Sequence, residues 1–292
     1  MNPILARLAN GEILVADGAM GTMLFQKGLK PGDCPELFNL TKPEILEEIA
    51  GTYLDAGADI IQTNTFGGSP AKLSGYSLEE KAVEINQAAV RSVKKAVGGR
   101  AYISGSCGPS GKILKPYGDT EPELLYDSFK IQMEALINAG VDMLCIETMI
   151  DLNEALIALR AARSISREIP VAVTMSFDKT PKGFYTMMGV SIRDAVSGLE
   201  EAGASMIGSN CGNGLQVMIE IAGEFKKLAT LPVIIQSNAG LPESINDKLV
   251  YSEDPEFFAI NTRELVNGGI SIIGGCCGTT PEHIQAIRKV VG

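Results

Sequence analysis

The chain has 292 residues, of which 32 are glycine, six are cysteine and one is histidine. Thirty-five acidic side chains against 25 basic ones give a net charge of −10, which argues against nucleic acid and anionic membranes as partners. No apolar run reaches the roughly 18 residues that span a bilayer, and Arg7 and Glu12 interrupt any signal-peptide core. We therefore expect a cytoplasmic protein, and six cysteines are too few for a disulfide scaffold.

Eight short apolar runs are expected to form buried strands. Runs of this length, without polar alternation, are typical of strands that are covered on both faces. In four of them a glycine turn ends a helical pattern just before the strand, because glycine readily adopts the left-handed conformation. In chain order the segments that contain the runs are 12–18, 54–64, 101–108, 137–148, 171–178, 200–211, 233–240 and 266–277.

A helical pattern follows each run, and most of these patterns have a recognisable start. The expected starts are Pro43, the capping box Ser77–Glu80, Pro122, Asp151, Ser191 or Asp194, Leu215 (which has no clean cap), Asp254 and Thr280. Eight strand–helix units without a linker predict a single-domain (β/α)8 TIM barrel over residues 1–292. A doubly wound open sheet has the same local signals and is the alternative.

The cysteines divide according to their place in this barrel, whose active site is expected at the carboxyl ends of the strands. Cys211, Cys276 and Cys277 end the sixth and eighth strands, which one strand separates, so their sulfurs are expected to converge. Three thiolates suit a zinc ion.

The remaining cysteines and the histidine are not expected to bind metal. Cys145 is expected in the core and Cys34 in a loop without chemistry, whereas the role of Cys107, near the rim, stays open. The lone His283 is expected to be a solvated or capping residue of the last helix.

Three protein ligands leave a fourth zinc position open, which is typical of catalytic sites. A substrate thiol bound there is deprotonated and becomes a nucleophile suited to in-line attack on a methyl group. Asp17 and Glu147 are placed to bind an ammonium group, and backbone N–H groups after Asp17 are placed to bind a carboxylate. These features together describe a thiol amino acid, although the two carboxylates are also consistent with solvated rim residues.

Five motifs resemble the homocysteine S-methyltransferase family, over a range from Glu12 to Val291. They are Asp17–Thr22, Asp59–Gly67, Asn210–Cys211, Asn238–Gly240 and Gly274–Pro281. The sequence is most similar to the homocysteine-binding module of cobalamin-dependent methionine synthase.

The resemblance implies a zinc barrel with a defined set of site residues. Cys211, Cys276 and Cys277 would bind the metal, with homocysteine as the fourth ligand. Asn238 would approach the zinc when substrate is absent. Asp17 and Glu147 would hold the amino group, the turn at Gly18 and Ala19 would hold the carboxylate, and Asn64 and Thr65 belong to the substrate-binding set. In the methionine-synthase type the methyl donor is methylcobalamin on a separate module or corrinoid protein; other members use betaine or S-methylmethionine.

Three segments depart from the family pattern. They are Ser237, the Gly-Asn-Gly sequence after Cys211, and Met187–Ser191. We expect them to line the pocket, so they bear on the identity of the thiol and of the methyl donor. The alternatives are a related methyltransferase with another donor or acceptor, and a non-catalytic redox sensor in which Cys276 and Cys277 form a strained disulfide.

Overall fold

Eight parallel strands form a closed barrel in the structure, a computed structural model that describes residues 2–245 and 248–292. The sheet order is β1-β12-β9-β8-β5-β4-β3-β2, and a parallel bridge between Ala16 and Ile60 joins its two edges. This closure confirms the predicted TIM barrel and rules out an open sheet. The barrel strands are β1 (Leu14–Val15), β2 (Ile60–Gln62), β3 (Tyr102–Cys107), β4 (Met143–Met149), β5 (Val171–Met175), β8 (Met206–Asn210), β9 (Val233–Ser237) and β12 (Ile272–Gly275).

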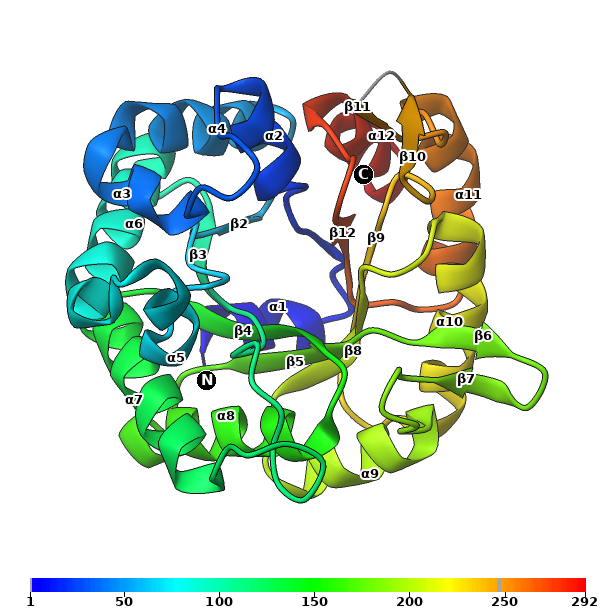
Figure 1. The fold of residues 1–292 in the computed structure, drawn as a ribbon. Helices are drawn as coiled ribbons and strands as arrows, with labels where there is room; N and C mark the ends of the chain where they lie inside the picture. The colour runs from blue at the N-terminus through cyan, green and yellow to red at the C-terminus, as the bar shows by residue number, and fades with distance from the viewer. Residues whose placement is uncertain (1, 246–247) are drawn as a thin grey trace.

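Helices form an outer ring around the strands (Figure 1). The longer ones are α4 (Pro43–Asp55), α6 (Ala82–Val97), α7 (Pro122–Ala139), α8 (Leu152–Ile165), α9 (Ile192–Glu201), α10 (Leu215–Leu228), α11 (Pro255–Asn267) and α12 (Pro281–Val291). The shorter ones are α1 (Pro3–Ala9), α2 (Met20–Gln26), α3 (Phe38–Thr41) and α5 (Pro70–Leu73), with 3-10 turns η1 (Pro35–Leu37), η2 (Ser74–Tyr76) and η3 (Glu79–Lys81). Within the described ranges, no helix combines the length and apolarity that membrane crossing requires.

Most predicted helix starts are confirmed, and one is wrong. Asp151, Ser191 and Asp254 accept hydrogen bonds from the first-turn amides of α8, α9 and α11, and α10 begins at Leu215 without a side-chain cap. The capping box at Ser77 does not form. Ser77 instead has the left-handed conformation (φ 56°) after η2, and α6 starts five residues later, beyond the η3 turn.

Two antiparallel hairpins interrupt the barrel pattern and were not predicted. One pairs β6 (Asp178–Thr180) with β7 (Gly183–Tyr185) after β5, and the other pairs β10 (Glu243–Ile245) with β11 (Lys248–Val250) after β9. Each lies in the connection between a barrel strand and the next helix, so both hairpins belong to the end of the barrel where the site is expected.

Three of the four glycine-turn segments brace the opposite end of the barrel. Asp59 and Asp142, each at the start of a strand, accept the N–H groups of Val15 (2.9 Å) and Ile103 (2.7 Å) in a neighbouring strand. Ser205 accepts the N–H of Val171 in the same way (3.2 Å). In each case the polar residue two positions after the turn glycine accepts a backbone N–H of the neighbouring strand with its side chain, and so adds a hydrogen bond to those of the sheet.

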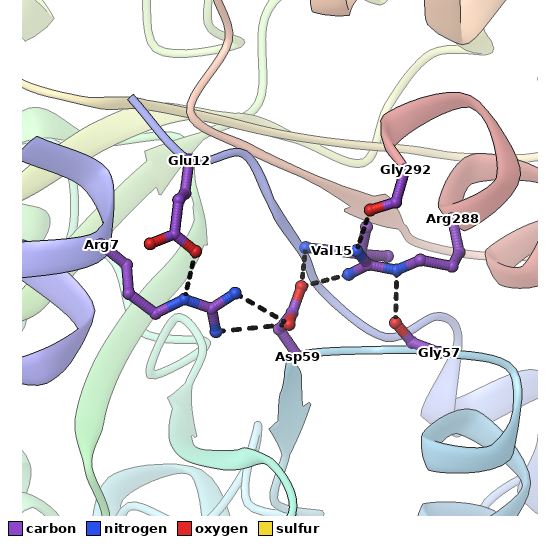
Figure 2. A network of polar contacts seen from close by, with 7 residues as sticks. All are labelled: Arg7, Glu12, Val15, Gly57, Asp59, Arg288 and Gly292. Atoms are coloured by element: carbon purple, nitrogen blue, oxygen red, sulfur yellow. Dashed lines mark hydrogen bonds and ion pairs between the residues drawn. The ribbon is translucent and has the colours of Figure 1, made fainter. Parts of the chain in front are cut away.

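Asp59 is the centre of an ion-pair network that connects the first and last helices (Figure 2). Arg7 of α1 lies 3.4 Å from one carboxylate oxygen, and Arg288 of α12 pairs with the other. Arg7 also pairs with Glu12 at 2.8 Å, and Arg288 donates to the carbonyl of Gly57 at 2.8 Å. The network lies where β1 meets β2, so it supports the seam at which the barrel closes.

The interior of the barrel is apolar in one half and polar in the other. Ile4 and Leu8 of α1 pack against a buried cluster that lines the amino-terminal half, and α1 lies across the middle of the ring in Figure 1. The cluster contains Leu14, Ile60, Met143, Met206, Ile234 and Ile272. Towards the carboxyl ends the buried residues of these strands become polar, as at Glu147, Asn210 and Gln236. Polar side chains in a water-poor interior need partners, so this half is the place for a ligand.

Candidate active site

The three predicted metal-binding thiols converge at the carboxyl end of the barrel. Cys211 follows β8, Cys276 and Cys277 follow β12, and β9 lies between them in the sheet. Their sulfur atoms all lie within 4.8 Å of one another. The Sγ atoms of Cys211 and Cys277 are 3.8 Å apart, and all three cysteines are free.

Backbone hydrogen bonds hold both thiol-bearing loops against β9. The N–H of Cys211 donates to the carbonyl of Gln236 (3.1 Å), and the N–H of Cys276 donates to the carbonyl of Ser237 (2.7 Å). Cys211 has a left-handed conformation with φ 60°, which costs a non-glycine residue about 1–2 kcal/mol. The surrounding contacts therefore keep Cys211 in a conformation that it would not adopt alone, as is common at functional sites.

The spacing of the sulfurs fits a tetrahedral zinc ion. Zinc–sulfur bonds of about 2.3 Å at the tetrahedral angle place two sulfurs about 3.8 Å apart, which is the separation between Cys211 and Cys277. Three sulfur donors are also the chemistry that zinc prefers over harder cations. One sulfur pair thus has the separation that tetrahedral zinc requires, and all three donors are of the type that zinc prefers, so the cluster could hold the metal with one position left for another ligand.

The environment of these thiols differs from that of the other cysteines. Hydrogen bonds from Cys276 and Cys277 lower the pKa of Cys211, whereas the hydrogen bonds of Cys276 with Cys211 and Cys277 raise the pKa of Cys276.

The other three cysteines lie in surroundings that keep the thiol protonated. Burial raises the pKa values of Cys34, Cys107 and Cys145. Cys107 is the last residue of β3 and so lies near the rim, as predicted, but its thiol is fully buried, 3.1 Å from Oε1 of Gln132. Cys145 lies in the barrel interior, as predicted.

A cavity of about 260 Å³ adjoins the thiols. Seven of the ten predicted site residues line it: Gly18, Ala19, Asn64, Glu147, Cys211, Cys276 and Cys277. Asp17, Thr65 and Asn238 do not line the cavity and are buried beside it. The predicted residues thus gather at one place, with three of them behind its wall.

Two buried carboxyl groups stand out in this region. Burial raises the pKa of Glu147 to about 7 and that of Asp17 to about 8, and the charge of Glu147 contributes to the shift of Asp17. Ser106 and Asn210 donate hydrogen bonds to Glu147, the second at 3.3 Å. Oδ2 of Asp17 accepts the N–H of Gln62 (2.8 Å), while its buried Oδ1 has no partner among the described residues. A cationic ligand would offset the burial of both groups.

The other predicted contacts are partly occupied by the protein itself. The N–H of Ala19 donates to Oγ1 of Thr279 (3.2 Å), and the amide of Asn64 donates to Asn39 and to the carbonyl of Pro35. The hydroxyl of Thr65 contacts the carbonyl of Ser106. Asn64 and Thr65 therefore have the contacts of residues that shape the cavity wall, and their role in binding stays a prediction.

The three segments that depart from the family pattern do not line this cavity, contrary to expectation. Met187 and Met188 lie on the surface after the β6–β7 hairpin, 78% and 40% exposed. The N–H of Thr186 donates to the carbonyl of Val190 (2.9 Å) and closes this turn. Variation there therefore carries no information about the cavity wall.

Sequence reasoning missed several lining residues. Gln62 and Gln236 are polar residues near the ends of apolar runs, a signal that was available. Glu36 is a buried carboxylate in η1 that accepts the N–H of Gly67 at 2.6 Å. It lies in a loop far from any strand end, so no local pattern marked it. His283 is a capping residue, as predicted, but it is buried and not solvated.

Comparison with known proteins agrees with this geometry. The sequence model of the family described as homocysteine S-methyltransferase matches residues 14–291. The chain belongs to this family. It is 32% identical over 297 residues to methionine synthase of Mycobacterium leprae (strain TN) and 33% identical over 300 residues to that of Mycobacterium tuberculosis (strain ATCC 25618 / H37Rv). These alignments cover 96% of this chain, which spans about a quarter of the length of either relative (24% and 25%).

A solved structure shares the fold of this family member. The metallated form of the homocysteine methyltransferase MmuM from Escherichia coli superposes with a TM-score of 0.80 at 24% identity. The superposition covers 99% of both chains.

Proposed function

We propose that this protein is a zinc-dependent methyltransferase that converts L-homocysteine into methionine, with a methylcorrinoid on a separate protein or module as the methyl donor. The observation that carries the proposal is the convergence of three sulfur atoms within 4.8 Å beside a cavity that also contains Glu147. A thiol-binding centre and an ammonium-binding carboxylate in one cavity match the two ends of homocysteine.

Cys211, Cys276 and Cys277 would hold the zinc ion. When bound, the metal supplies deprotonation of a coordinated substrate thiol at neutral pH. The chain holds the loops of Cys211, Cys276 and Cys277 on β9. A substrate sulfur bound at this cluster would thereby be fixed in place, facing a methyl donor at the open end of the barrel. Orientation of this kind is a large part of the catalytic power of transferases.

Glu147 would bind the substrate ammonium group from the cavity wall, and Asp17 would contribute its charge from directly behind that wall. Both are buried and have raised pKa values, so an arriving ammonium favours their ionised forms and forms a charge-assisted hydrogen bond. Ser106 and Asn210 hold Glu147 in one orientation. The turn at Gly18 and Ala19 lines the same cavity and is our proposed site for the substrate carboxylate, with Asn64 and Thr65 supporting the wall and Asn238 beside the metal.

The choice of a corrinoid donor rests on the methionine synthases that the chain resembles. Because the chain spans only about a quarter of their length, the donor and its carrier are part of the proposal. S-methylmethionine is the competing donor, because the family resemblance implies members that use it.

Metal analysis and a turnover assay test the proposal. We expect about one zinc per chain in the wild type, loss of zinc in Cys211→Ser, and demethylation of free methylcobalamin when homocysteine is added, followed by the cobalamin absorption spectrum. Cys107→Ser is the matched control, because that buried thiol does not belong to the cluster of three. A metal-free wild type whose vicinal thiols titrate reversibly with oxidant would refute the proposal in favour of the redox sensor. Turnover with S-methylmethionine but not with methylcobalamin would refute only the proposed methyl donor.

A further inference from the structure

A short segment after the β10–β11 hairpin contacts the loops that carry the thiols. We call it the clasp segment, Tyr251–Asp254. It begins directly after β11 and ends at the cap of α11. Its contacts reach the loop after β8, the loop after β9 and the loop after β12.

The side chain of Glu253 holds the Cys211 loop. Its Oε2 accepts the N–H of Leu215 at 2.8 Å, at the start of α10. That helix has no side-chain cap of its own, so Glu253 takes the place of one. The carboxylate also lies so close to Gly214 that a Cβ at that position would clash. The Cys211 loop is thereby fixed at its far end.

The backbone of Glu253 reaches the other two loops. Its N–H donates to the carbonyl of Ala239 (3.0 Å), and the N–H of Ala239 donates to the carbonyl of Cys277 (3.0 Å). Its carbonyl lies 2.9 Å from Nε2 of His283, in the first turn of α12. Nδ1 of His283 accepts the N–H of Thr280 (3.1 Å), so a neutral imidazole with its proton on Nε2 satisfies both contacts. Burial lowers the pKa of His283 and favours this neutral form.

Tyr251 provides a third attachment. Its ring packs directly on Gly278, the residue after Cys277, and leaves no space for a Cβ there. Gly278 has φ 81°, so glycine is required at this position both by the backbone conformation and by the ring. The loop after β12, which carries Cys276 and Cys277, is thus held between β9 and the clasp segment.

We propose that the clasp segment positions the three thiolates, with Glu253 as the principal positioning residue, so that retention of the metal depends on it. This inference rests on the proposed zinc site. A metal site needs its ligands within a few tenths of an ångström of their ideal separations, yet Cys211 is held in an unfavourable conformation on an irregular loop. Without Glu253, the start of α10 loses its acceptor and the loop is free to relax away from Cys276 and Cys277.

Zinc release from the loaded protein tests this role, measured with a chromophoric chelator alongside the thermal midpoint. Glu253→Ala is expected to lose zinc affinity 10- to 100-fold, the usual effect of removing a residue that supports metal ligands. Glu253→Gln keeps an oxygen acceptor for Leu215 and is expected to behave like the wild type. Glu256→Ala, an exposed residue of the next helix, is the matched control and should have no effect.

A second pair of variants keeps the test valid if Glu253→Ala fails to fold. Tyr251→Ala is expected to release zinc faster than Tyr251→Phe, which keeps the ring on Gly278. Wild-type zinc retention in a folded Glu253→Ala, or in Tyr251→Ala, would overturn the inference, as would equal losses in Glu253→Ala and Glu253→Gln. A wild type that binds no zinc would instead refute the proposed function and this inference with it.

Discussion

Replacement of Glu147 by glutamine should remove a specific part of the pH dependence of stability. The folded protein raises the pKa of Glu147 from 4.5 to about 7, so the folded state binds this proton more tightly than the unfolded state. The contribution of protonated Glu147 to the free energy of unfolding is therefore fully present below pH 4.5 and is lost as the pH rises through 7. Between pH 5 and pH 7 the wild type should lose about 2 kcal/mol relative to Glu147→Gln, at about 1.4 kcal/mol per pH unit while the folded group is protonated.

Urea unfolding of both proteins at pH 5, 6 and 7 measures this difference. Asp17 is present in both proteins, and only the part of its pKa shift that comes from the charge of Glu147 differs between them. Glu168→Gln, at an exposed position, is the control and should run parallel to the wild type. A constant offset between the free energies of unfolding of wild type and Glu147→Gln would show that burial does not shift the pKa of Glu147.

The same variant should weaken homocysteine binding at least tenfold while its zinc content is unchanged, because a neutral amide attracts an ammonium less strongly. Equal loss of homocysteine and zinc would indicate a structural role for Glu147.

Three further predictions concern other parts of the molecule. Asp59→Asn should lower the free energy of unfolding by about 1–3 kcal/mol, because it removes two partly buried ion pairs; a change below about 0.5 kcal/mol in urea unfolding would contradict this. Gly18→Ala should weaken homocysteine binding and spare zinc, since the new Cβ would clash with Tyr53 and Thr279, and unchanged titration calorimetry would argue against it. Cys145→Ser should lower the thermal midpoint without loss of zinc, because it places a hydroxyl in an apolar interior; an unchanged midpoint would show that the hydroxyl finds a partner.

The fold and the three clustered thiols could be predicted from the strand pattern, because both depend on local signals in the sequence. Buried strands have a short apolar signature, and a closed barrel brings all their carboxyl ends together, so Cys211, Cys276 and Cys277 could be placed without any knowledge of distances. The same reasoning correctly assigned Cys145 to the interior.

The remaining features depend on contacts that have no signature in the sequence. Ser77 has the residues of a capping box, but the chain forms a left-handed turn there and starts α6 later. Glu36 reaches the cavity from a loop, and Glu253 acts through a backbone amide that is 38 residues away in the chain. Such partners are chosen by tertiary packing, which single-sequence patterns do not record.

The change from an apolar to a polar barrel interior divides the molecule into two parts that can vary independently. Leu14, Ile234 and Ile272 belong to the half that α1 covers, and they make no contribution to the cavity. Substitutions that repack this half can alter thermal tolerance while ligand preference is preserved. Conversely, the loops at the other end carry the thiols and the cavity lining, so substitutions there are expected to change the ligand-binding surface while the apolar half stays unaltered.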